Sequence, residues 1–321
     1  MLDLLGCTIN EKILALVGML LSFGLTFIGL KGGTRILPQD AGRDFAHDGK
    51  LSAGKPRGAG FVFILAFALT AFLFLPFSFE LLIDLLLTVA AMLAGFFDDR
   101  ALKPWGELKK GLLDLVLSAA AALTVWRFNP SAVDVPLIGM TVTIHPVLYV
   151  LLATALIWLS INVTNCADGV DGLSGTLAII TLLSICQAGA VMAMDETVHQ
   201  LILIMVFAIL AYLWYNATPS RLLMGDAGSR ALGLFIGIAI LKTGSPFLYI
   251  PLALVLIIDG GAGLVKVTII RLFKVNIMKN IRTPIHDHVR KNFGWSNTHT
   301  VFRFAIIQII LSFLVLWLLK L

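Results

Sequence analysis

The sequence predicts an all-α polytopic membrane protein with about ten transmembrane helices. Of its 321 residues, 59% are hydrophobic and only 13% are charged, whereas soluble domains carry about 25% charged residues. The mean hydropathy of +0.95 points the same way. The apolar residues also come in runs that approach or reach the roughly 17–25 residues of a spanning helix. We therefore interpret residues 1–321 as a single integral membrane domain.

Ten apolar runs follow one another along the chain. The first is not preceded by the positive segment of a signal peptide, so we expect it to remain as a membrane anchor. The eighth run, LGLFIGIAIL, is short, and the ninth is interrupted by Asp259-Gly260-Gly261. The runs cover residues 13–30, 58–78, 81–97, 111–126, 146–161, 173–194, 199–215, 229–243, 247–265 and 303–319.

Lysine and arginine orient these runs, because cytoplasmic loops carry an excess of both residues. With the N-terminus outside and the spans alternating, nineteen of the 24 basic residues fall in inner loops and four fall outside. We therefore expect both termini to be external. The net charge of +5 would then lie on the cytoplasmic face, where it suits anionic membrane lipids or a phosphorylated substrate. Nucleic acid is not an expected partner, because no soluble basic module remains.

Five polar stretches fall on the cytoplasmic side in this topology. Polar groups at membrane depth are costly and are usually functional. Their convergence on one side predicts a single site. The stretches are HDGKLSAGKPRGAG (47–60), FFDDR (96–100), NVTNCADGVDGLSG (162–175), YNATPSRLLMGDAGS (215–229) and TPIHDHVRKNFGW (283–295).

Asp98 and Asp99 are adjacent carboxylates at the end of the third run. Two like charges this close repel, which raises the pKa of one of them unless a cation lies nearby. A divalent metal would resolve the repulsion, whereas a raised pKa would suit a general base. A solvated loop start is the third alternative, and the doublet alone leaves all three open.

Further acids and amides follow along the chain. Asp168 and Asp171 would share a helix face with each other if ADGVDG were helical, and Asn165 precedes them; a tight Asp-Gly turn is the alternative. Asp226, in MGDAGS, stands where a carboxylate could hold Mg²⁺ or simply cap a helix. Asn216 ends the seventh run as either a cap or a ligand contact.

His286 and His288 form the densest titratable group, with Asp287 between them. Histidines two residues apart do not share a helix face, so joint chelation would need a loop, and a third zinc ligand at typical spacing is missing. Two donors to a phosphate fit better. Together, the inner-face carboxylates, bases and glycines predict Mg²⁺-assisted chemistry on a diphosphate, with a lipid and a cytoplasmic nucleotide as substrates.

The motifs FFDD, NVTNCADGVDGLSG, YNATPSRLLMGDAGSRALG and TPIHDHVRKNFGWSNTHTVFRF, in this order, resemble those of the polyprenyl-phosphate N-acetylhexosamine-1-phosphate transferases. The resemblance covers about residues 40–305 and is nearest to the phospho-N-acetylmuramoyl-pentapeptide transferase branch. It implies ten spans, external termini and a cytoplasmic active site in the bacterial plasma membrane. It also implies Mg²⁺ as cofactor, a homodimer, and transfer of phospho-N-acetylmuramoyl-pentapeptide from its UDP derivative to undecaprenyl phosphate. The products would be UMP and lipid I, for peptidoglycan synthesis.

The resemblance also implies a role for each candidate residue. Asp98, assisted by Asp99, would deprotonate or orient the lipid phosphate. Asp226 would hold Mg²⁺, with Asn165 as a second metal ligand, and His286 would act at the diphosphate or sugar. The remaining candidates would bind substrate: Asn165, Asp168, Asp171 and Asn216 on the nucleotide side, His288 at the diphosphate or sugar, and Lys50 with Lys109 or Lys110 at the phosphates.

Four departures from the family pattern leave the sugar open, and one of them is the basic Arg290-Lys291 pair in place of an acid. Asp287 replaces the middle residue of a His-His-His motif, Leu223 replaces an aromatic residue before MGD, and GKPRGAG replaces GTPTMGG. The alternative substrate is UDP-N-acetylglucosamine, although GWSNTHTVFRF favours the muramoyl branch. A more distant alternative is a cation-coupled transporter, which would have its acids near the midplane. Direct attack by the lipid phosphate and a covalent aspartyl route both remain open.

Overall fold

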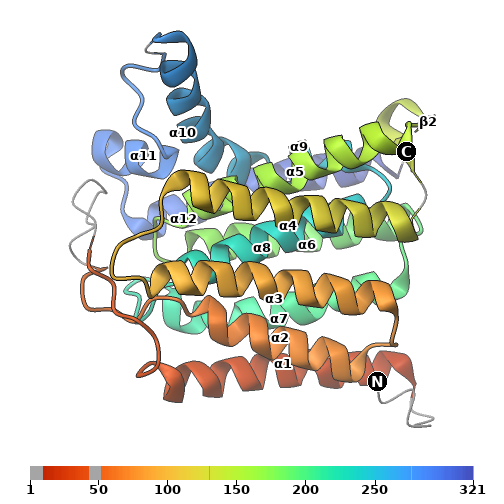
Figure 1. Cartoon of the computed structure of the whole chain (residues 1–321), viewed down its shortest axis with the longest axis horizontal. Helices are drawn as coiled ribbons and strands as arrows, with labels where there is room; N and C mark the ends of the chain where they lie inside the picture. Colours follow the sequence, from red (N-terminus) through yellow and green to blue (C-terminus); the bar gives the residue numbers. More distant parts are fainter. Residues whose placement is uncertain (1–9, 43–51, 130, 276, 321) are drawn as a thin grey trace.

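The computed structural model describes residues 10–42, 52–129, 131–275 and 277–320. These residues form a bundle of helices with one antiparallel hairpin, β1 (Ala132–Val135) and β2 (Met140–Thr143), joined by the 3-10 turn η3 (Pro136–Ile138) (Figure 1). The helices are α1 (Glu11–Gly33), α2 (Gly60–Phe74), α3 (Phe79–Asp99), α4 (Glu107–Phe128), α5 (Pro146–Ala167), α6 (Leu173–Val191), α7 (Glu196–Asn216), α8 (Gly225–Leu241), η4 (Pro246–Leu248), α9 (Tyr249–Leu252), α10 (Leu254–Phe273), α11 (Ile285–Phe293) and α12 (Asn297–Leu318).

The predicted all-α membrane fold is confirmed in its class. Seven of the described helices are long and apolar enough to cross a membrane, namely α1, α3, α4, α5, α6, α7 and α12. The bent pair Pro246–Leu252 and Leu254–Phe273 adds an eighth when it is counted as one span. The second and eighth predicted runs are also helical, but α2 has only 15 residues and α8 only 17.

The sequence prediction placed the interruption of the ninth run at the wrong residues. The chain bends by 89° between Leu252 and Leu254, whereas Asp259, Gly260 and Gly261 lie inside α10 as regular helix. Ala253 at the bend has an irregular conformation and separates α9 from α10. Asp259 is therefore a side chain on a helix, available for contacts with another element.

Helix α8 is the centre of the bundle. Every one of its residues is buried, and its neighbours include α2, α3, α4, α5 and α6. The approach of α3 is especially close, because a Cβ on Gly95 would overlap the backbone oxygen of Asp226 at the start of α8. This glycine contact sets the last turn of α3 beside the first turn of α8.

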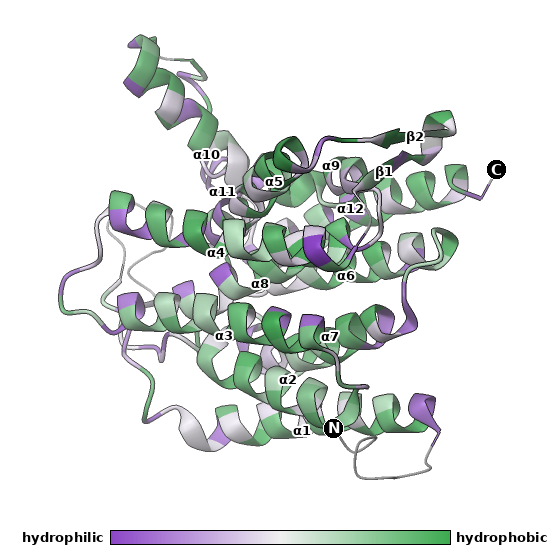
Figure 2. Ribbon diagram, turned by 45° about the vertical axis from the view of Figure 1, so that its right-hand side comes forward, coloured by the Kyte–Doolittle hydropathy of each residue, from purple (hydrophilic) through white to green (hydrophobic). Residues whose placement is uncertain are grey.

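The two ends of the bundle differ in what they carry. The described chain ends and the β1–β2 hairpin lie at one end, and the last turn of α3 and first turns of α4 and α8 lie at the other (Figure 1). Apolar residues cover most of the helix surfaces, and hydrophilic residues are concentrated at helix ends and in connections (Figure 2). Large apolar side chains are exposed along α1, α4, α5 and α12, as expected of surfaces in contact with lipid.

Candidate active site

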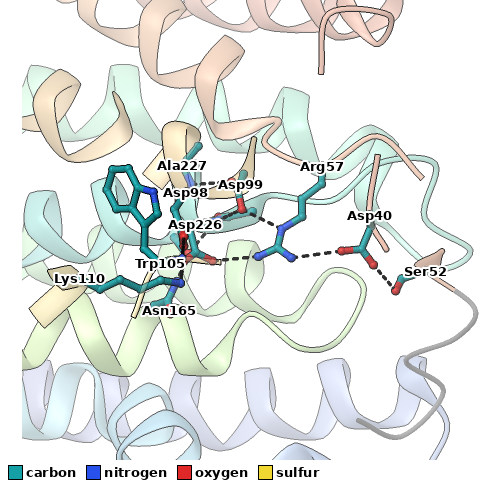
Figure 3. A network of polar contacts seen from close by, with 12 residues as sticks. Asp40, Ser52, Arg57, Asp98, Asp99, Trp105, Lys110, Asn165, Asp226 and Ala227 are labelled. Carbon is teal, nitrogen blue, oxygen red and sulfur yellow. Dashed lines mark hydrogen bonds and ion pairs between the residues drawn. The ribbon is translucent and has the colours of Figure 1, made fainter. Parts of the chain in front are cut away.

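Asp98, Asp99 and Asp226, here called the carboxylate cluster, lie together where α3 ends and α8 begins (Figure 3). Asp99 accepts hydrogen bonds from the backbone N–H groups of Asp226 at 3.1 Å and Ala227 at 3.0 Å. It thus caps the N-terminus of α8 from another helix, where unpaired N–H groups and the helix dipole favour an anion. The structure therefore brings the FFDD and MGDAGS motifs together, as the sequence predicted.

Gly225 makes this cap sterically feasible. Its φ of +72° lies in the left-handed region, which glycine adopts without strain. A Cβ at this position would overlap the Oδ2 atom of Asp99. The glycine before Asp226 is therefore needed for both its backbone conformation and its lack of a side chain.

Cations pair with all three members of the cluster. Lys110 forms ion pairs with Asp98 and, at 3.2 Å, with Oδ2 of Asp226. Oδ1 of Asp226 lies 3.0 Å from Nη2 of Arg57. The second oxygen of Asp98 accepts the backbone N–H of Trp105 at 2.7 Å. The repulsion expected of the Asp98–Asp99 doublet is thus offset in this structure by the side chains of a lysine and an arginine.

Arg57 is a central residue that the sequence reasoning missed. Its Nε lies 2.8 Å from Oδ1 of Asp99, and its Nη1 lies 3.2 Å from Oδ1 of Asp40. Burial opposes the charged form, but the carboxylates of Asp99, Asp226, Asp40 and Asp168 more than offset it and raise the pKa of Arg57. The guanidinium is therefore a permanent cation. The signal that could have found it is its position in HDGKLSAGKPRGAG (47–60), a polar stretch from which only Lys50 was selected.

The three lysines predicted to bind phosphate differ in where they lie. Lys110 is at the carboxylate cluster. The ammonium group of Lys109 lies 3.3 Å from the centre of the Trp105 ring, so its charge faces the indole in a cation–π contact. Lys50 lies outside the described residues. Of the alternatives Lys109 and Lys110, the structure places Lys110 next to the acids.

Asn165 also faces the start of α8. Its Nδ2 donates to Oγ of Ser229 at 2.9 Å, and that hydroxyl in turn donates to the backbone oxygen of Gly225 at 3.0 Å. Ser229 is a further site residue that the sequence reasoning did not select. Through this serine, Asn165 is connected to the first turn of α8, which carries Asp226.

The donor types at this place suit Mg²⁺, which prefers oxygen ligands and often takes some of them from substrate phosphates. The residues present fit such an ion by chemistry, because Asp98, Asp99 and Asp226 contribute carboxylates and Asn165 an amide oxygen. They are not preassembled around a metal, since the described residues contain no group of three or more His, Cys, Asp or Glu arranged for one. Both oxygens of Asp226 are held by Arg57 and Lys110.

His286 is buried, 2% exposed, and is fixed by Asp259 of α10. The carboxylate accepts the backbone N–H of His286 at 2.7 Å and contacts Nδ1 at 2.8 Å. An ionised Asp259 can only accept, so Nδ1 carries a proton, and in the neutral ring Nε2 then presents its lone pair. Nε2 lies against Gly169, where a Cβ would overlap it. Asp259, a second residue missed from sequence, thus joins α10, α11 and the ADGVDG segment.

His288 does not share a helix face with His286. Residues Ile285–Phe293 are helical, and residues two apart point to different faces of a helix. The Nδ1 atom of His288 accepts the backbone N–H of Arg282 at 3.3 Å, and its ring lies edge-on to Phe293 with 5.5 Å between ring centres.

The ADGVDG segment is a turn between α5 and α6. Asp168 caps the end of α5, and Gly172 begins α6 with a φ of +83°. Asp171 accepts the backbone N–H of Ser220 at 3.1 Å and lies 3.8 Å from Nζ of Lys55. The turn alternative is therefore correct here, and the two aspartates do not share a helix face.

Asn216 holds this turn in place. Its Oδ1 accepts the backbone N–H of Gly172 at 2.8 Å, and its Nδ2 donates to the backbone oxygen of Leu222 at 2.9 Å. The side chain is buried. The amide thus joins the end of α7 both to the start of α6 and to the connection between α7 and α8.

Comparison with known proteins gives consistent results. A model described as glycosyl transferase family 4 matches residues 81–244. A phospho-N-acetylmuramoyl-pentapeptide-transferase of Treponema pallidum (strain Nichols) is 39% identical over 314 residues, covering 92% of this chain and 86% of the relative. Proteins of the same name from Symbiobacterium thermophilum and Dictyoglomus thermophilum are each 31% identical, covering 76% and 83% of this chain and 76% and 84% of their own lengths.

Proposed function

Because this chain belongs to glycosyl transferase family 4 and is a phospho-sugar transferase, we propose that it makes lipid I. It would transfer phospho-N-acetylmuramoyl-pentapeptide from its UDP derivative to undecaprenyl phosphate and release UMP. The observation that carries this proposal is the carboxylate cluster with its two cations, buried where a membrane bundle meets its polar connections. Such a place can receive a lipid phosphate from the bilayer and a diphosphate from water.

The proposal includes a topology. The single domain would cross the bacterial plasma membrane ten times, with α2, α8 and the α9–α10 pair among the spans. Both termini would be external and the carboxylate cluster would face the cytoplasm. The location of the described chain ends at the opposite end of the bundle from the cluster supports this arrangement (Figure 1). By family resemblance, the assembly would be a homodimer in membrane lipid.

Mg²⁺ would be held by Asp226 and by the amide oxygen of Asn165. Bound there, it would neutralise charge on the diphosphate and stabilise the charge that develops during transfer. Lys110 would neutralise a phosphate alongside Asp98. Nε2 of His286, with its proton on Nδ1 facing Asp259, would accept a hydrogen bond from the substrate.

In the proposed direct mechanism, the carboxylate of Asp98 orients the lipid phosphate and accepts any proton it carries. A lipid phosphate oxygen then bonds to the sugar-linked phosphorus of the diphosphate. The bond from that phosphorus to the bridging oxygen breaks, and the bridging oxygen leaves with UMP. Phosphoryl transfer of this kind depends mainly on positioning and charge neutralisation, which the paired acids and bases would supply. A covalent aspartyl route would instead give a trapped phospho-enzyme without the lipid acceptor.

The test measures UMP release by purified protein with Mg²⁺, undecaprenyl phosphate and either UDP-N-acetylmuramoyl-pentapeptide or UDP-N-acetylglucosamine. We expect release with the muramoyl substrate only when the lipid is present. Asp98→Asn should abolish release but keep nucleotide binding, whereas Asp134→Asn, on the β1–β2 hairpin, should remain active. Turnover of UDP-N-acetylglucosamine alone would overturn the sugar assignment, and no UMP from either substrate would overturn the reaction.

A further inference from the structure

Arg57 contacts acids from three separate parts of the chain. It extends from the connection between α1 and α2, where the GKPRGAG stretch lies, towards the ends of α3 and α8 (Figure 3). Each nitrogen of its guanidinium has a different partner: Nε lies near Asp99, Nη1 near Asp40 and Nη2 near Asp226, at 2.8, 3.2 and 3.0 Å. A planar fork suits this arrangement in a way that a lysine ammonium does not.

Asp40 holds the guanidinium of Arg57 through Nη1, the nitrogen that does not contact the carboxylate cluster. Its carboxylate accepts hydrogen bonds from the hydroxyl of Ser52 at 2.6 Å and the backbone N–H of Gly42 at 3.1 Å, besides the contact with Arg57. Its own backbone pairs with Lys55 on the returning strand of the same connection. Asp40 is buried as well. The arginine therefore has an anchor that does not belong to the carboxylate cluster.

The charges at the cluster leave no free oxygen on Asp226. Arg57 holds Oδ1 and Lys110 holds Oδ2, so the two side chains supply the two positive charges that one divalent cation would bring. Each carboxylate oxygen keeps a second lone pair, but a divalent cation at Asp226 would repel both side chains, so we expect it to replace one of them. Lys110 has a single ammonium nitrogen that also serves Asp98. Arg57 can give up its Nη2 contact alone, because Nε and Nη1 keep their own partners.

We propose that Arg57 releases Asp226 to the divalent cation and turns its freed Nη2 group to the diphosphate of the nucleotide substrate. This rests on the proposed function and deepens it, because it assigns phosphate binding to a residue that is not among the candidates predicted from sequence. The guanidinium fork matches phosphate oxygens through charge-assisted hydrogen bonds. Arg57 would thus neutralise the acids when no metal is bound to them, and would bind the substrate when a metal is bound.

The exchange predicts two opposite effects of removing the arginine. Arg57 competes with the metal for Asp226, so its loss should strengthen metal binding in the absence of nucleotide. Arg57 also binds the diphosphate, so its loss should weaken nucleotide binding at saturating metal. A purely structural role would weaken both, because uncompensated buried carboxylates disturb the site.

The experiment uses the full-length protein carrying Arg57→Gln, with Arg57→Lys as a second variant. Arg271→Gln is the matched control, since it removes the same charge from an exposed pair with Glu107. Mn²⁺ binding is followed by electron paramagnetic resonance without nucleotide, and UDP binding by calorimetry at saturating Mn²⁺. For Arg57→Gln we expect Mn²⁺ affinity to rise about tenfold and UDP affinity to fall about 10- to 100-fold, as for the loss of a charge-assisted hydrogen bond. The control should match the wild type in both.

Thermal melting shows whether each variant is folded. If Arg57→Gln is not folded, the test uses Arg57→Lys. A lysine ammonium is too compact to contact all three acids. We therefore expect UDP affinity to fall and Mn²⁺ affinity to stay equal or rise. Unchanged affinities, or both affinities lower in a folded variant, would overturn the exchange. UMP release by the wild type in the same preparation separates the two proposals. If the wild type releases no UMP, the proposed function is wrong. If the wild type is active but the Mn²⁺ and UDP affinities of the Arg57 variants do not shift in opposite directions, only the proposed role of Arg57 is wrong.

Discussion

At the scale of single residues, Asp259 determines how His286 is presented. The carboxylate fixes both the backbone N–H and Nδ1 of the histidine, and the pair is buried with Asp259 only 1% exposed. A ring held through Nδ1 keeps Nε2 in a set direction and tautomer. Asp259 is therefore a positioning residue, since it would act on the substrate only through the histidine.

Asp259→Asn tests this role. An amide keeps the size of the side chain but has a single acceptor oxygen, so it cannot satisfy both N–H groups of His286 as the carboxylate does. We expect kcat for UMP release to fall about 10- to 100-fold, as for other lost orienting partners, with KM for the UDP-sugar little changed. Asp134→Asn, on the β1–β2 hairpin at the other end of the bundle, is the control. An Asp259→Asn protein that melts like the wild type and keeps its kcat would contradict the role.

The residues found from sequence and those missed differ in a physical way. Asp98, Asp99 and Asp226 stand in polar motifs at the ends of apolar runs, where a charge stands out. Arg57, Asp40 and Asp259 are single charges whose importance depends on long-range contacts, such as the pairing of Arg57 with Asp226. Sequence position alone does not reveal such contacts. Asp259 did interrupt an apolar run, and that signal predicted a broken helix where the structure has a partner for histidine.

At the scale of secondary-structure elements, the packing of α3 against α8 assembles the site. Gly95 of α3 lies so close to the first turn of α8 that no Cβ fits beside the backbone of Asp226. The last turn of α3 therefore comes into register with the N-terminus of α8, and Asp99 can cap it. Sequence analysis predicted both helices but not their contact, because nothing in a single sequence says which glycine faces which helix.

Gly95→Ala should separate α3 from α8. Overpacking at a close contact typically costs about 1–3 kcal/mol, so we expect a lower melting temperature and weaker UDP binding. Gly24→Ala in α1 is the matched control, since a Cβ there meets nothing within 4 Å and alanine favours a helix interior. Equal melting temperatures for the two variants would show that this contact does not limit the packing.

The geometry of the ninth run also bears on the transporter alternative. That alternative depended on a helix broken at Asp259-Gly260-Gly261, as in transporters with unwound spans. The helix is continuous there, and the bend occurs at Ala253. The ninth run is thus broken, but not at the Asp259-Gly260-Gly261 sequence on which the alternative rested.

At the scale of the whole molecule, the uneven distribution of Lys and Arg along the sequence and the structure both indicate that the two ends of the helix bundle differ. The fold class and the approximate positions of the apolar helices could be predicted from sequence, because the length of an apolar run is a local property. The burial of α8 on all sides could not, since an apolar helix can face either lipid or protein. Likewise, α2 is shorter than the run 58–78 that predicted it.

Cysteine labelling tests the proposed orientation. In a background without Cys7, Cys166 and Cys186, Met140→Cys on β2 should react with a membrane-impermeant thiol reagent in intact cells. Lys103→Cys, in the connection between α3 and α4, should react only after the membrane is opened. The expected difference follows from the excess of Lys and Arg in the inner loops. Labelling of Lys103→Cys in intact cells, with protection of Met140→Cys, would reverse the topology.

The central claim is that the carboxylate cluster of Asp98, Asp99 and Asp226 is where metal and diphosphate meet. An experimental structure of the protein with UDP and Mn²⁺ tests it most directly, because the anomalous signal of Mn²⁺ marks the metal. The account predicts a Mn²⁺ peak in contact with Asp226 and the diphosphate beside Arg57 on the same end of the bundle. Mn²⁺ and UDP bound elsewhere, for instance in the cavity lined by Asp84 and Lys242 at the opposite end, would contradict it.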